Sequence, residues 1–178
     1  MTATAAEPRS TRPAPDEYAP YYGTYIARVA DGDVVQALRN QIGGTLSYLR
    51  AIPDARAGHR YAAGKWSIRE VVGHVADAER IFAYRALRFA RNDSTALPGF
   101  DENAFVSASR FGDRALSSIV AELEAVRGAT VAFFDALFPE EWTRHGTASG
   151  KEMSVRALAW VIAGHELHHL GVLKTRYV

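Results

Sequence analysis

The sequence predicts an all-α protein, a four-helix bundle in up-down-down-up order with a long crossover between the second and third helices. Four stretches repeat apolar residues with the period of a helix, two of them begin with capping signals, and no stretch alternates convincingly like a strand. Helices with one apolar face bury those faces against one another. Residues 21–29, YYGTYIARV, are the weakest point of this all-α interpretation.

The first predicted helix covers about residues 34–51. Asp33 followed by Gln36 resembles a capping box, in which side chains bond free N–H groups at the helix start, and Pro53 marks the end. Its apolar stripe consists of Val35, Leu38, Ile42, Leu46 and Leu49.

The other three predicted helices follow the same logic. Ser67 and Glu70 form a capping box for the second, which runs to about Arg91. The third spans about residues 115–137, with the apolar stripe Ile119, Leu123, Val126, Phe133 and Leu137. The fourth spans about residues 154–176, with the apolar stripe Leu158, Val161, Ile162, Val172 and Leu173.

The composition predicts a globular protein with neither a nucleic-acid partner nor a membrane partner. Of 178 residues, 48% are hydrophobic and 23% charged, and the formal net charge of +1 offers no electrostatic attraction to nucleic acid or an anionic membrane. No apolar run reaches the roughly 20 residues that span a bilayer. Because the N-terminus also lacks the apolar region of a secretory signal, we expect a cytoplasmic protein.

Two parts of the chain differ in character. Residues 1–20 are rich in Ala, Pro, Ser and Thr and are expected to form a flexible tail, whereas residues 21–178 are expected to form a single helical-bundle domain. The chain has no cysteine, so any metal must be held by His, Asp or Glu.

The clearest chemical signal is GHELHHLG, residues 164–171, on the fourth predicted helix. His165 and His169 stand one turn apart on the side of Leu158, so both imidazoles face the bundle interior. A single inward histidine is usually packed and hydrogen-bonded, but two leave polar nitrogens stranded unless they share a divalent cation. His74 faces inward from the second predicted helix and completes a candidate set of three metal ligands.

The same letters also match H-E-x-x-H, the motif of zinc proteases. That motif needs a third ligand farther along the chain. The nine residues after His169 contain no His, Asp or Glu, so the protease interpretation fails.

The three histidines constrain the topology as well. His74 lies about two turns from the start of its helix, and the pair His165 and His169 lies about two to three turns from the end of theirs. They reach the same level only if the second and fourth helices are antiparallel. An up-down-down-up bundle meets this condition and needs a long second connection, which agrees with residues 92–114, the longest of the three connections.

These residues also carry a family resemblance. The segments KWSIREVVGHVADAER, LPGFDENAF and AGHELHHLGVLKTRY resemble the DinB-like, or YfiT-like, superfamily of small bacterial proteins, and the similarity extends from about Tyr21 onward. The resemblance implies a four-helix bundle with the crossover topology and a homodimer. It also implies a divalent metal on His74, His165 and His169.

The activity that the resemblance implies is less specific. Related proteins include metal-dependent hydrolases and enzymes that use a low-molecular-weight thiol, such as mycothiol, bacillithiol or glutathione, as transferases or isomerases. We therefore expect a metal-dependent hydrolase or a thiol S-transferase that acts on a small molecule. The alternative is a non-catalytic metal-binding stress-response protein, whose metal only stabilises the bundle.

Three neutral imidazoles leave a coordination position open for water, which is typical of catalytic zinc. Zinc suits three nitrogen ligands, and nickel, iron and manganese are alternatives. Glu166 is a candidate general base, and His168 is a second-choice ligand. Glu70 and Asp77 are candidates to orient His74 through its other ring nitrogen, although a capping or surface role also explains them.

Arg85 projects inward from the second predicted helix, so its guanidinium needs an anionic partner. The first interpretation is a structural pairing with Asp101 or Glu102 of the crossover, and the second is binding of a substrate carboxylate. Trp66 and the tyrosines of residues 21–25 are candidates for lining a pocket.

Overall fold

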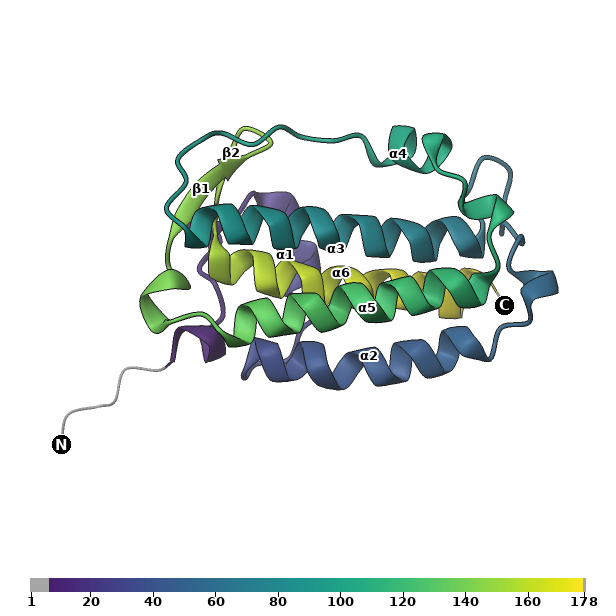
Figure 1. The fold of residues 1–178 in the computed structure, drawn as a ribbon, viewed down its shortest axis with the longest axis horizontal. Coiled ribbons are helices and arrows are strands. Elements are labelled where there is room, and N and C mark those ends of the chain that lie inside the picture. The colour runs from purple at the N-terminus through teal and green to yellow at the C-terminus, as the bar shows by residue number, and fades with distance from the viewer. Residues whose placement is uncertain (1–6, 178) are drawn as a thin grey trace.

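The computed structural model of the protein describes residues 7–177 and is predominantly helical (Figure 1). The four long helices are α2 (Val34–Arg50), α3 (Ile68–Ala90), α5 (Leu116–Asp135) and α6 (Val155–Arg176). The two short helices are α1 (Gly23–Ile26) and α4 (Glu102–Ala108). A small antiparallel hairpin joins β1 (His145–Ala148) to β2 (Lys151–Ser154). The predicted four-helix class is confirmed, with the long helices within about two residues of their expected ends.

The order of the bundle also agrees with the sequence prediction. Helices α2 and α6 run one way along the bundle, and α3 and α5 run the other way (Figure 1). The main packing is of α3 against α5 and α6, and of α2 against the same two helices. The consecutive helices α2 and α3 therefore lie diagonally, which confirms the up-down-down-up order and makes α3 and α6 antiparallel neighbours.

The crossover between α3 and α5 travels the length of the bundle and is fixed near both ends (Figure 1). Near its start, Leu97 donates its N–H to the Thr147 carbonyl at 2.8 Å and accepts from the Ser149 N–H at 3.0 Å, which joins the crossover to the hairpin. Near its end, the Phe111 ring packs on Gly73 of α3, where a Cβ would lie 2.5 Å from the ring. Gly73 therefore permits the close approach of the crossover to α3.

The hairpin corrects the expectation that the chain contains no strand. Each strand has only four residues, too few for a clear alternation, and its two-residue turn is formed by Ser149 and Gly150 with φ of 54° and 73°. An isolated two-stranded hairpin is marginal in water. This one is stabilised by burial of Ala148 and Met153 in the bundle core. The uncertain segment 21–29, by contrast, is helical around α1.

The predicted caps begin the helices as expected, with one difference. Ser67 and Glu70 form the complete capping box at the start of α3. At α2 the Asp33 carboxylate accepts from two backbone N–H groups, but the Gln36 side chain donates to Asn40 at 3.0 Å instead of bonding back to the cap. The start of α2 is therefore a simple N-cap.

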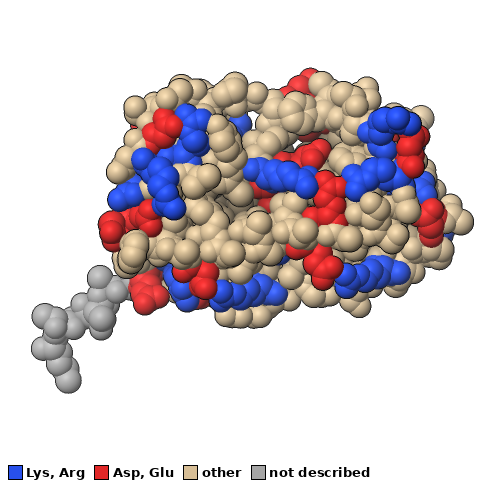
Figure 2. Space-filling view, viewed as in Figure 1, with Lys and Arg blue, Asp and Glu red and all other residues tan. Residues whose placement is uncertain are grey.

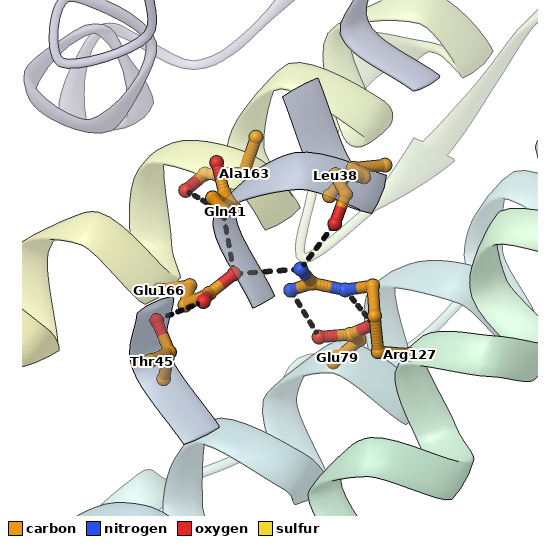
Figure 3. Close-up of polar contacts among 7 residues, drawn as sticks. All are labelled: Leu38, Gln41, Thr45, Glu79, Arg127, Ala163 and Glu166. Carbon is orange, nitrogen blue, oxygen red and sulfur yellow. Dashed lines mark hydrogen bonds and ion pairs between the residues drawn. The ribbon is translucent and has the colours of Figure 1, made fainter. Parts of the chain in front are cut away.

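The core consists of two apolar clusters, one toward each end of the bundle. Between them lies a buried polar layer with a residue from each long helix (Figure 3). The guanidinium of Arg127 on α5 donates to both carboxylate oxygens of Glu79 at 2.8 Å each. It also pairs with Glu166 at 2.6 Å and donates to the Leu38 carbonyl at 3.1 Å. One cation thus joins carboxylates from α3 and α6 in the interior.

The predicted flexible tail lies partly outside the described residues, which begin at residue 7. From there on the segment is bound to the bundle. Glu17 is buried and accepts from the Ser154 hydroxyl at 2.7 Å and from the Arg156 guanidinium. Arg12 donates to the Ile26 carbonyl at 2.8 Å. These contacts tie the segment to α1 and to the start of α6.

The surface carries both signs of charge. Figure 2 shows basic and acidic side chains interspersed on the face that presents α3 and α5. On these helices Arg80 pairs with Asp77 at 3.3 Å and Glu122 at 2.7 Å, and Arg114 pairs with Glu122 at 2.6 Å. Among the helices of residues 7–177, none combines the length and the apolar character needed to cross a bilayer.

Candidate metal centre

Three imidazoles from two helices meet at one point beside the core. His74 comes from α3, and His165 and His169 come from successive turns of α6. The Nε2 atom of His165 lies 3.2 Å from that of His74 and 3.1 Å from that of His169. One nitrogen from each of the three residues lies within 4.8 Å of the others. The antiparallel packing of α3 and α6 produces this convergence.

The donor set fits a divalent ion. A tetrahedral zinc ion with Zn–N bonds of about 2.0–2.1 Å holds its nitrogen ligands about 3.3 Å apart. The measured nitrogen separations of 3.1 and 3.2 Å are close to this value. Only one proton can lie between each facing pair of nitrogens, so hydrogen bonding alone satisfies the three rings poorly.

The electrostatics favour neutral imidazoles. Burial lowers the pKa of His74 to about 4, although the nearby Glu102 carboxylate opposes the change. Burial and the neighbouring imidazoles hold the pKa values of His165 and His169 well below their ordinary 6.5. At neutral pH all three rings therefore present lone pairs, which is the protonation state that a metal requires.

Aromatic residues fix the orientation of the imidazoles. The Tyr25 ring meets His165 edge-on with centroids 5.2 Å apart, and the Trp66 ring lies 4.7 Å from that of His74. Gly164 makes the first contact feasible, because a Cβ there would lie 2.1 Å from the Tyr25 carbonyl oxygen. The glycine lets α1 pack directly on α6. Tyr25 and Trp66, which were predicted to line a pocket, thus contact the histidines directly.

Two cavities adjoin the histidines. The first, of about 290 Å³, reaches all three of them and is lined by the aromatic residues Tyr21, Tyr22, Tyr25, Trp66, Phe82 and Phe100. The second, of about 280 Å³, shares Trp66, His168 and His169 with the first and is also lined by Lys65 and Tyr177. Each is near the lower limit of roughly 300 Å³ for small-molecule pockets. The first is called the aromatic cavity below.

Comparison with known proteins agrees with this architecture. A family model described as the DinB superfamily matches residues 37–173, most of the chain. The chain belongs to the DinB superfamily. The family recognised from the histidine segments is thereby confirmed.

Individual DinB relatives are distant. A protein of Oceanobacillus iheyensis, named as a proposed metal-dependent hydrolase, is 26% identical over 142 residues, or 79% of each chain. YfiT from Bacillus subtilis, described as a probable metal-dependent hydrolase with an unusual four-helix bundle topology, superposes with a TM-score of 0.70 at 19% identity, over 93% of this chain and 90% of that one. The mycothiol-dependent maleylpyruvate isomerase has a TM-score of 0.65 at 13% identity, over 78% of this chain and 58% of that one.

Within this DinB fold, Glu166 has a different place from the one expected of a general base. Its side chain points from α6 toward α2 and α5 (Figure 3). Beyond its ion pair with Arg127, its carboxylate accepts from Thr45 at 2.5 Å and from Gln41. It does not line the aromatic cavity. The contacts therefore disfavour the expected catalytic role of Glu166, because its oxygens are buried and already bonded.

The other residues considered beside the metal lie around the site without joining the ligand cluster. His168 lines both cavities, and burial lowers its pKa, but its nitrogens are not in the convergent set. Glu70 caps α3 and pairs with Arg60 at 2.7 Å. Asp77 pairs with Arg80 on the surface. Both carboxylates are thus bound elsewhere, which favours the capping and surface interpretations over a contact with His74.

Arg85 is buried as predicted, but its expected carboxylate partner is absent. Its Nη2 donates to the Pro98 carbonyl at 3.0 Å and to the Ser149 hydroxyl at 3.1 Å, which does tie the crossover to the hairpin. Asp101 instead caps α4. In the described part of the chain no carboxylate pairs with Arg85, and its Nη1 has no hydrogen-bond partner. The predicted pairing with Asp101 or Glu102 is therefore corrected.

Sequence reasoning missed the role of two residues in the site. Glu102 lines the aromatic cavity, and its charge opposes the lowering of the His74 pKa by burial. Ser149 reaches the same cavity from the hairpin turn. The segment LPGFDEN around Glu102 was a visible signal, but the Ser149 position depends on a hairpin that the sequence did not reveal.

Proposed function

We propose that the protein is a metal-dependent enzyme that acts on a small molecule, with His74, His165 and His169 as the metal ligands. Hydrolysis is the reaction that the site supports best. The observation that carries the proposal is the convergence of three neutral, largely buried imidazoles at the wall of a cavity of about 290 Å³. Zinc matches three nitrogen ligands best, with nickel, iron and manganese as alternatives.

The chain supplies the remaining parts of a hydrolytic site. A divalent ion held by the three histidines would supply Lewis acidity, which polarises a carbonyl and lowers the pKa of water. Glu102 is the carboxylate on the cavity wall, so it takes the place of Glu166 as the candidate general base. The aromatic residues exclude water and offer an apolar surface to a small organic substrate.

A thiol S-transferase is the second candidate. It is favoured by the two cavities, which both reach His169 and so give room for two reactants beside the same ligand. The thiol would be activated by the same ion, because metal coordination favours a thiolate. The structural relative that uses mycothiol is consistent with this candidate.

Metal content tests the proposal first. Untagged protein should contain about one divalent ion per chain, and His74→Ala should lose it, because two imidazoles hold a catalytic ion weakly. His145→Ala is the matched control, since His145 is exposed on β1 outside the histidine cluster. Elemental analysis gives the result. The proposed set of three histidine ligands is contradicted if wild-type protein contains no metal, or if His74→Ala contains as much metal as wild-type protein.

Activity and stability distinguish the candidates. Metal-loaded protein is screened for ester and amide hydrolysis, and for transfer of low-molecular-weight thiols. A non-catalytic metal protein would show neither activity and would lose much of its melting temperature on chelation. We expect only a small loss, because both apolar clusters pack independently of the ion. Light scattering tests the predicted homodimer.

A further inference from the structure

A buried cation, whose charge no carboxylate of residues 7–177 balances, lies behind the wall of the aromatic cavity. Arg85 is 2% exposed, and among residues 7–177 its Nη1 has no hydrogen-bond partner. Its guanidinium lies near the faces of Phe82 and Phe100, 5.9 and 5.8 Å from the ring centroids. Burying a charge in an apolar setting is unfavourable unless an anion accompanies it. Arg127, the comparable arginine on α5, has two carboxylates.

The neighbours of Arg85 connect it to the cavity. Phe82, Phe100 and Ser149, which surround the guanidinium, all line the aromatic cavity. Tyr22 lines it as well; burial raises the pKa of its phenol, and the Arg85 charge opposes that rise. The guanidinium therefore lies directly behind the cavity wall, on the same side of α3 as the metal-site histidine.

Ser149 provides a second donor. Its Oγ accepts from Arg85 Nη2 at 3.1 Å, which leaves its own hydroxyl hydrogen free to donate to a ligand. The residue occupies a left-handed backbone conformation with φ of 54°, which a serine adopts at some cost where glycine would be relaxed. The strained turn holds the hydroxyl beside the arginine.

We propose that Arg85 and Ser149 form a carboxylate-binding subsite, and that the substrate is a small organic anion. Its carboxylate lies at this subsite and its reacting group lies at the histidines. The two donors, Arg85 Nη1–H and the Ser149 hydroxyl, match the two oxygens of one carboxylate. The Phe82 ring lies 5.9 Å from the Arg85 guanidinium and 5.8 Å from the His165 ring, so the carboxylate and the reacting group are no more than about 12 Å apart. This inference rests on the proposed function.

A matched pair of probes tests the subsite. 4-(4-Fluorophenyl)butyrate and its amide share an aromatic body that suits the cavity and differ in the charge of one end. Their dissociation constants are measured by fluorine NMR with protein as purified and again after chelation. The carboxylate should bind at least about tenfold tighter than the amide in both forms, because a charge-assisted hydrogen bond is involved.

Variants assign the preference to the subsite. In Arg85→Gln the carboxylate and amide should bind within about twofold of each other, since the charge is lost while an amide donor remains. Arg80→Gln, which removes an exposed arginine from the same helix, should keep the full preference. Ser149→Ala should reduce the preference without abolishing it. If Arg85→Gln does not fold, Ser149→Ala decides the question, and an unchanged preference there overturns the subsite.

Other outcomes separate this inference from the proposed function. Equal binding of the two probes by wild-type protein, or no binding of the carboxylate, overturns the subsite and leaves the metal site standing. A preference that survives Arg85→Gln but disappears on chelation places the carboxylate on the metal, which also overturns it. A preference in wild-type protein that contains no metal would support the subsite while the proposed function fails.

Discussion

The buried polar layer at mid-bundle makes a quantitative prediction about stability. Arg127→Met keeps the apolar stem but removes the cation between Glu79 and Glu166, whose side chains are 2% and 1% exposed. Removing one partner of a buried ion pair costs about 3–5 kcal/mol. Without Arg127, Glu166 still accepts hydrogen bonds from Thr45 and Gln41. Glu79 has no other hydrogen-bond donor in the described chain. We therefore expect a loss near the middle of that range, about 4 kcal/mol.

Urea unfolding followed by circular dichroism measures this loss. With a slope of about 2 kcal/mol/M for a domain of this size, the midpoint should fall by about 2 M at neutral pH with an unchanged slope. The deficit should shrink as the pH is lowered. Acid removes the charge of the two orphaned carboxylates in the variant and so relieves the cost of burying it.

Two comparisons control for other effects. Arg80→Met removes an arginine that also pairs with two carboxylates, but on the surface. This substitution should lower the free energy of unfolding by at most about 1 kcal/mol. The combined variant Glu79→Gln, Arg127→Met, Glu166→Gln removes all three charges and should recover most of the lost stability. If Arg127→Met is no more destabilising than Arg80→Met, the network does not stabilise the bundle and the reasoning is refuted.

Three further predictions follow from the site and its supports. Glu102→Gln should lower kcat by about 10²–10⁴ with metal content unchanged, and an unaltered rate in steady-state kinetics would exclude it as the general base. Burial raises the pKa of Glu17, but bonds from Arg156 and neighbouring donors outweigh this and lower it below 4.5. The ionised Glu17 carboxylate therefore stabilises the folded state fully above pH 4.5, and this stabilisation is lost as the pH falls through the lowered pKa of Glu17. Melting temperature against pH should show an acid limb that Glu17→Gln weakens. Gly164→Ala should cost about 1–3 kcal/mol in urea unfolding, because its Cβ would meet the Tyr25 carbonyl; a neutral result would mean that α1 can shift.

Much of the metal centre could be predicted from the sequence, because the positions of its histidines follow from residue spacing within single helices. Helical periodicity places His74, His165 and His169 on inward faces, and their positions along the helices require α3 and α6 to be antiparallel. The crossover topology then follows from the length of one connection. Each step uses spacing along the chain, which helix geometry converts directly into angle and height.

The rest depended on which side chains meet across the bundle. Helical periodicity shows that Glu166 lies to one side of His165. Only the packed structure shows that Arg127 lies on that side and pairs with it. The candidate base is therefore part of the buried polar layer. Likewise, the sequence placed Arg85 inside, and only the tertiary structure showed that it lies beside Ser149 with no carboxylate partner among residues 7–177. Helix geometry sets the direction of a side chain, whereas its chemistry is decided by the neighbours that folding brings to it.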